Sequence, residues 1–172
     1  MMIYGLSFIY EKIFLIKGNS VCGKSSTAQK LKAELGTSVL LLQQDEIRKH
    51  MLDEKEVANN QAISLMGSLI AWGEHHVDYI ILEGILKKSL YQTMLDQLKN
   101  RFTDKMLTFY FNVSFEESWQ RNLLKEHPFS KAVLQNWWQD HDELGYEDKI
   151  FQADENLDQK ITDMINYAKI SG

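Results

Sequence analysis

The sequence feature that most constrains the fold is a loop bounded by glycines, Gly18-Asn19-Ser20-Val21-Cys22-Gly23-Lys24-Ser25. Residues 13–16 before it form a continuous apolar run, as expected of a strand that is buried on both faces. After Lys24, apolar residues recur at helical spacing, and Gly36 supplies a helix stop. A glycine loop between a buried strand and a helix predicts a layered fold in which strands and helices alternate.

The same loop matches the pattern G-x-x-x-x-G-K-[ST] without a mismatch. Glycines let the backbone curl so that successive N–H groups face phosphate oxygens, and the following helix presents its positive end. Lys24 would reach the β and γ phosphates, and Ser25 would bind Mg²⁺. We therefore predict an ATP·Mg²⁺ site formed by Gly18, Asn19, Ser20, Val21, Cys22, Gly23, Lys24, Ser25 and Ser26. The alternatives are an unrelated glycine turn and, for Cys22, a thiol of lowered pKa rather than a small residue that fits.

Further strands are predicted at residues 38–42, 79–82, 107–111 and 150–151. Apolar spacing predicts helices over residues 55–74, around 90–98, and over 114–126, 131–140 and 157–168. The pattern indicates an α/β fold with a five-stranded, mostly parallel sheet and helices on both faces. No linker or internal repeat divides the chain, so we predict one domain over residues 1–172.

Composition narrows the classes of function. The formal net charge of -5 argues against an extended nucleic-acid surface. The single cysteine fits a reducing compartment, and no apolar stretch is long enough to span a membrane. The apolar residues 1–10 lack the pattern of a signal peptide. We expect a cytoplasmic protein, monomeric or homodimeric, without a membrane partner.

Charged residues follow two of the predicted strands. Asp45 and Arg48, at positions i and i+3, would point the same way at the carboxyl end of the second strand, where ligands bind in open α/β sheets. There Asp45 could accept the proton of an attacking hydroxyl while Arg48 holds an anion. The alternative is a helix N-cap with a surface arginine. Glu83 ends the third strand, where it could orient Mg²⁺ or simply mark the strand end.

A helix with two cations on one face precedes the only proline. Ser114 and Glu117 form a capping-box pair that opens it, and Trp119 fits an apolar stripe along it. Arg121 and Lys125, at i and i+4, would close over the ATP phosphates as part of a small helical lid over residues 121–135. The alternative for both is a solvated basic face.

Together, the phosphate loop, the segment Gln43-Gln44-Asp45-Glu46-Ile47-Arg48, the strand end Ile81-Leu82-Glu83-Gly84 and the Arg121 helix resemble the nucleoside/nucleotide-kinase-like branch of P-loop proteins. More narrowly they resemble polynucleotide kinase, the zeta toxins and chloramphenicol phosphotransferase. The resemblance implies the three-layer P-loop NTPase fold, Asp45 as general base and Arg48 as a phosphate ligand. It also implies an adenine site near residues 152–154, and Lys125 stands where polynucleotide kinases carry a second lid arginine.

We therefore predict transfer of the ATP γ-phosphoryl group to a hydroxyl of a small molecule or nucleotide. The predicted catalytic residues are Lys24, Asp45, Arg48, Glu83 and Arg121, with Lys125 as a nucleotide ligand and Ser25 and Glu83 at the metal. Two alternatives stay open. One is an ATP-dependent switch that a protein partner regulates, and the other is a polynucleotide 5′-hydroxyl kinase, which the negative charge disfavours.

Overall fold

The sheet is the centre of the molecule. A computed structural model of the chain describes residues 12–170, so the apolar opening lies outside the described part. Five strands pair in the order β2-β3-β1-β4-β5, and every neighbouring pair is parallel. The strands are β1 (Lys12–Gly18), β2 (Val39–Gln43), β3 (Tyr79–Gly84), β4 (Met106–Asn112) and β5 (Lys149–Gln152). The α/β prediction is confirmed, with a wholly parallel sheet.

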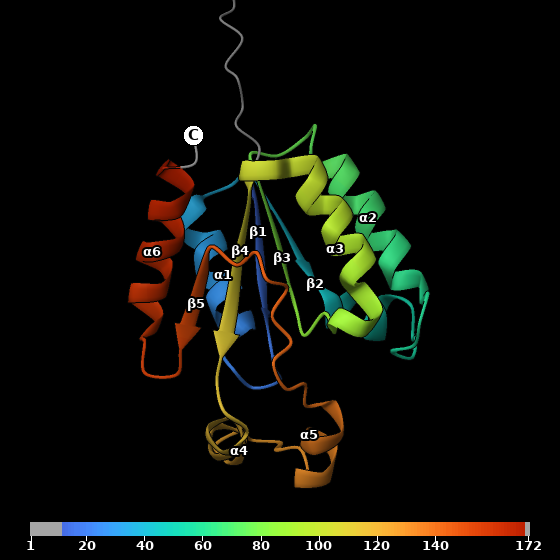
Figure 1. Cartoon of the computed structure of the whole chain (residues 1–172), viewed down its shortest axis with the longest axis vertical. Helices are drawn as coiled ribbons and strands as arrows, with labels where there is room; N and C mark the ends of the chain where they lie inside the picture. The colour runs from blue at the N-terminus through green and yellow to red at the C-terminus, as the bar shows by residue number, and fades with distance from the viewer. Residues whose placement is uncertain (1–11, 171–172) are drawn as a thin grey trace, which may run out of the picture.

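Helices cover both faces of this sheet (Figure 1). One face carries α1 (Lys24–Leu35) and α6 (Leu157–Ile170), and the other carries α2 (Gln61–Gly73) and α3 (Lys88–Phe102). A short 3₁₀ turn, η2 (Thr103–Lys105), joins α3 to β4. Two further helices, α4 (Phe115–Leu123) and α5 (Lys131–Trp137), lie beyond the carboxyl ends of the strands. None of the helices within residues 12–170 is long and apolar enough to cross a membrane.

The central strand β1 shows why the sheet needs helices on both sides. Ile13 and Leu15 pack in the core under α2 and α3, whereas Phe14 and Ile16 pack in the core under α1 and α6. All four side chains are completely buried, as the alternation of side chains along a strand requires. Burial of each contributes about 1.5–3 kcal/mol, so both helical layers stabilise the same strand.

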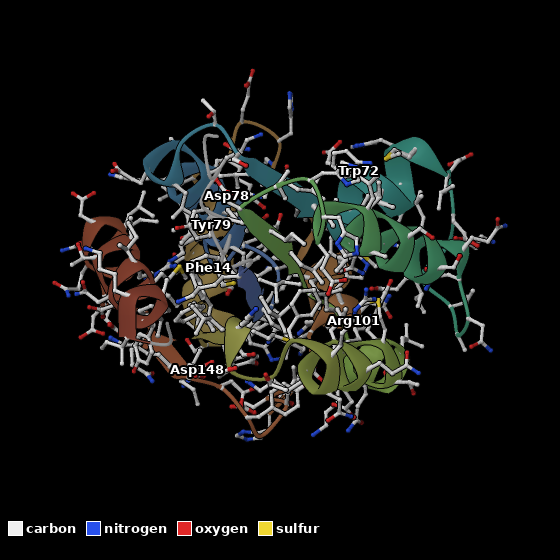
Figure 2. All side chains as sticks on the ribbon, turned by 90° about the horizontal axis from the view of Figure 1, so that it is seen from above. Phe14, Trp72, Asp78, Tyr79, Arg101 and Asp148 are labelled. Atoms are coloured by element: carbon white, nitrogen blue, oxygen red, sulfur yellow. The ribbon has the colours of Figure 1, made fainter. Side chains whose placement is uncertain are left out.

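The amino end of the sheet is closed by packing (Figure 2). Phe14 and Tyr79 lie side by side there, with ring centroids 6.1 Å apart. Asp148 binds Thr108 twice: its carboxylate accepts the Thr108 N–H at 2.7 Å, and its own N–H donates to the Thr108 carbonyl at 2.8 Å. Side chains fill the amino end of the sheet in this way, so we expect a ligand-binding site at the carboxyl ends of the strands.

Three helix predictions are wrong in extent, since the helix predicted over residues 131–140 ends at Trp137. The helix predicted over residues 55–74 begins only at Gln61, because Asn59 adopts a positive φ and breaks the helical path. The helix predicted through residue 126 ends at Leu123. Its buried residues are Ser118 and Asn122, not the predicted apolar stripe. The prediction of the Ser114 cap is confirmed, since its hydroxyl accepts the Glu117 N–H at 3.1 Å.

Candidate active site

A cavity of about 420 Å³ opens at the carboxyl ends of the strands. Residues 20–26 of the glycine loop line it, together with Asp45, Arg48, Glu83, Arg121 and Lys125. The structure thus brings together nearly all the predicted site residues, which come from four separate segments. Gly18 and Asn19 are the two that do not line this cavity.

The glycine loop is curled and stands at the start of α1. Val21 and Gly23 have φ angles of 59° and 95°, a conformation that costs energy for a β-branched residue and little for glycine. Gly18 is required for a different reason, because a Cβ there would lie 2.9 Å from the Phe111 carbonyl oxygen. Lys24 is buried, and its ammonium donates to the Asn19 carbonyl at 2.6 Å. The lysine is therefore held inside the loop, where an anion in the cavity could exchange for that carbonyl.

Glu83 and Ser25 meet at one side of the loop. The Ser25 hydroxyl donates to Glu83 Oε1 at 2.9 Å, and the Gln43 amide donates to the same oxygen at 2.9 Å. Adjacent ligands in a Mg²⁺ octahedron with bonds of about 2.1 Å lie about 3 Å apart, so this pair of oxygens fits the metal predicted from the sequence. Gln43 fixes the carboxylate from the neighbouring strand.

Asp45 directly precedes and Arg48 lies on a π-helical turn, η1 (Glu46–Met51), whose last bond runs from the Leu52 N–H to the Ile47 carbonyl at 3.2 Å. Arg48 donates to Asp45 Oδ1 at 3.2 Å and to the Glu54 carbonyl at 2.8 Å. The predicted shared orientation is confirmed. The N-cap alternative is not supported, because the Asp45 side chain makes no capping hydrogen bond to this turn.

Lys49 is a neighbour of Asp45 that the sequence argument did not identify. Its ammonium binds Asp45 Oδ2 at 2.8 Å. Burial by itself would raise the pKa of Asp45, but the Lys49 ammonium and the Arg48 guanidinium outweigh it and hold the pKa below the usual value. Asp45 is consequently a carboxylate at neutral pH, able to accept a hydrogen bond from a hydroxyl.

Arg121 connects α4 to the glycine loop. Its guanidinium donates to the Cys22 carbonyl at 3.4 Å, to the Ala153 carbonyl at 2.9 Å and to Glu117 at 2.9 Å. Ala153 belongs to the segment after β5 that the family resemblance places near the adenine. Lys125 also lines the cavity, 4.9 Å from the centre of the Phe129 ring, although it follows the helix rather than lying on it.

Further cavity residues carried no signal in the sequence. Glu56, Phe129 and Trp137 line the cavity with Lys49. The Lys49 ammonium lies 5.3 Å from the centre of the Trp137 ring, so the turn after β2 touches α5. Glu56 was missed because the sequence argument placed that residue within a helix.

Asn19 joins the glycine loop to the segment that follows α5. Its amide accepts the Gln139 N–H at 2.8 Å and donates to the Gln139 carbonyl at 2.7 Å. Two residues before it, buried Lys17 binds the Asp142 carboxylate and carbonyl, and Asp142 also accepts the first free N–H of α3, from Lys88. The start of the loop is thereby tied to two other parts of the site.

Asn19→Ala is expected to destabilise the protein by about 1–3 kcal/mol, because the backbone N–H and carbonyl of Gln139 both lose their hydrogen-bond partner. Thermal unfolding and hydrogen exchange of the Gln139 amide would measure the effect. Asn112→Ala is the control, since Asn112 is exposed and binds only Gln152 at 3.1 Å in the described part of the chain. Equal stability of the two variants would contradict the anchoring role.

Gly84 and Gln44 form the floor between β2 and β3. A Cβ on Gly84 would lie 2.4 Å from Gln44 Oε1, and the Gln44 side chain is almost completely buried. The same oxygen accepts the Leu86 N–H at 2.9 Å. Only glycine therefore lets the end of β3 approach this glutamine.

Gly84→Ala is expected to cost about 1–3 kcal/mol of stability, since overpacking here also displaces a buried hydrogen-bonded amide. Gly67→Ala is the matched control, because nothing lies within 4 Å of a Cβ at that helical position. The control should be neutral or stabilising by up to about 1 kcal/mol. A Gly84→Ala melting temperature equal to that of Gly67→Ala would contradict the steric argument.

Comparisons with known proteins give structural relatives only. No protein-family model matches the chain, and no curated protein is significantly similar to it. Among solved structures, the APS kinase CysC of Mycobacterium tuberculosis in complex with AMPPNP and APS superimposes with a TM-score of 0.69 at 15% identity, over 92% of this chain and 98% of that one. A gluconokinase from Sinorhizobium meliloti 1021 gives 0.65 at 12% over 93% of each chain. A shikimate kinase from Bacteroides thetaiotaomicron gives 0.57 at 12% over 92% of this chain and 98% of that one. The chain therefore has the five-stranded parallel α/β fold of the P-loop kinases.

Proposed function

We propose that the protein is an ATP-dependent phosphotransferase that moves the γ-phosphoryl group to a hydroxyl of a small molecule. The observation that carries the proposal is the shared cavity: the glycine loop and the Asp45–Arg48 pair line the same space of about 420 Å³. A nucleotide-binding module would need only the loop. This cavity also holds the carboxylate of Asp45, which pairs with Arg48 and Lys49. These charged groups provide a place for a second reactant.

The donor half consists of the loop and its neighbours. The backbone of residues 20–26 would hold the triphosphate, and Lys24 would neutralise the charge that develops on the transferred group. Mg²⁺ bound at Ser25 and Glu83 would supply further positive charge to the phosphate oxygens. Arg121 would stabilise the phosphates from the side of α4, and its contact with the loop carbonyl of Cys22 supports this role.

The acceptor half consists of Asp45 and Arg48. Asp45 would accept the proton of the attacking hydroxyl, and Arg48 would hold the transferred phosphoryl group or an anion of the acceptor. Arg48 is suited to this because its side chain is only 10% exposed and is fixed by the Glu54 carbonyl. The segment with α4 and α5 would act as a lid that excludes water, which a kinase needs in order to avoid hydrolysis.

A screen of hydroxyl-bearing metabolites for ATP consumption above the basal rate tests this proposal. At least one small acceptor should raise ADP formation and yield a phosphorylated product by mass spectrometry. ATP hydrolysis that only a protein partner stimulates would instead support a regulated switch. Transfer of label to an oligonucleotide 5′ end, with no small acceptor active, would support a polynucleotide kinase.

A further inference from the structure

One carboxylate in the cavity has no place in the reaction just described. Glu56 lies on the segment between η1 and α2. It lines the cavity together with Asp45 and Arg48. Its side chain is only 15% exposed, and a carboxylate in such a place is costly unless its oxygens are hydrogen-bonded.

The partners of Glu56 fix its position. Gln44 donates to Glu56 Oε1 at 2.9 Å, and Lys87 pairs with Glu56 Oε2 at 3.2 Å. Gln44 is itself held by the Tyr91 hydroxyl at 2.9 Å and by the Leu86 N–H at 2.9 Å. The carboxylate is therefore oriented by the ends of β2 and β3 rather than by its own loop alone.

The carboxylate still has capacity for a ligand. Its two oxygens can accept about four hydrogen bonds, and Gln44 and Lys87 use one on each oxygen. Because the residue lines the cavity, the remaining lone pairs suit a hydrogen-bond donor placed there. Asp45 has the same capacity, since Arg48 and Lys49 use one lone pair on each of its oxygens.

Charge decides which kind of donor fits. Around the acceptor half, Arg48, Lys49 and Lys87 provide three cations against the two carboxylates Asp45 and Glu56. A cationic amine would add to an existing excess of positive charge. A neutral hydroxyl, on an acceptor that is itself neutral or anionic, meets no such repulsion.

We infer that Glu56 binds the acceptor by accepting a hydrogen bond from a second hydroxyl, so that the acceptor class is a small neutral or anionic polyol, such as a sugar, sugar alcohol or sugar acid. The inference rests on the proposed function and deepens it. Asp45 faces the hydroxyl that is phosphorylated, and Glu56 accepts a hydrogen bond from another hydroxyl of the same molecule.

The test compares two classes of acceptor with the full-length protein. One panel holds sugars, sugar alcohols and sugar acids, including gluconate, and the other holds molecules with a single hydroxyl, including 3-hydroxybutyrate. Wild type should phosphorylate a member of the first panel with the higher kcat/KM. Phosphorylation of single-hydroxyl compounds with equal or higher kcat/KM would overturn the inference and leave the proposed function standing. Activity with neither panel would overturn both.

Variants then separate binding from packing. Glu56→Gln should raise the KM for the active polyol about tenfold to a hundredfold, with a smaller effect on kcat, because a hydrogen bond to a charged group is lost. Lys87→Met leaves the Glu56 carboxylate in place and should raise the KM for the polyol less. Glu46→Gln, an exposed carboxylate paired only with His50 within residues 12–170, should change it less than about twofold. Equal effects of Glu56→Gln and Lys87→Met would show a structural role and overturn the inference.

Discussion

Lys24→Met is expected to lower kcat/KM for phosphoryl transfer by about 10²–10³-fold or more, because it removes a positioned positive charge from the phosphates. The lysine is 7% exposed, and its ammonium is held at the Asn19 carbonyl inside the loop. Steady-state transfer to the best acceptor, together with calorimetric ATP binding, would measure the loss.

The control for this variant is Lys30→Met on the same helix. Lys30 is partly exposed and pairs with Asp158 at the surface, so its removal should leave kcat/KM within about twofold, since surface pairs contribute little. A Lys24→Met enzyme with near-wild-type turnover would contradict the assignment of the loop as the donor site.

Asp45→Asn is expected to lower kcat by about 10²–10⁴-fold while ATP affinity stays nearly unchanged, because a general base acts on the acceptor and not on the nucleotide. Single-turnover rates and ATP binding should be measured on the same preparation. Asp53→Asn is the control, since Asp53 is exposed and has a positive φ that asparagine also tolerates. Equal loss of turnover and of ATP affinity would count against Asp45 as the base.

The pH profile gives a second check on Asp45. Its pKa is held below the usual value of about 3.9 for aspartate, and the active form is the deprotonated one. Activity that depends on this group should therefore persist from neutral pH down to about pH 4 and fall only below it. A fall in kcat/KM near pH 6 that disappears in Asp45→Asn would show that the pKa of Asp45 is raised, and would contradict this prediction.

The local parts of the site could be predicted from the sequence. The glycine loop is specified by residues within a few positions of one another, because its shape depends on backbone conformations that glycine permits. The i, i+3 spacing of Asp45 and Arg48 also placed both groups on one side, although the turn is a π-helix rather than the expected helix start. Both predictions concern neighbours along the chain.

The helix predicted over residues 55–74, which includes Glu56, was wrong at its start for the opposite reason. Ala58 and Ala62 fit a helical period, so the sequence favoured a helix through residue 56. In the structure the Glu54 N–H donates to the Arg48 carbonyl at 2.8 Å, and the Glu54 carboxylate accepts the Ala62 N–H at 3.2 Å. These hydrogen bonds give residues 52–60 a loop conformation that the spacing of apolar residues along the sequence cannot predict.

The sequence by itself thus determined the alternation of buried strands and helices and the phosphate loop, since hydrophobic period and glycine chemistry are local properties. Only the tertiary structure decided which charged groups share the cavity. The contacts of Ser25 with Glu83, of Asn19 with Gln139 and of Glu56 with Lys87 join residues far apart in the chain. Such pairs arise from the strand order β2-β3-β1-β4-β5, which places the ends of separate strands side by side.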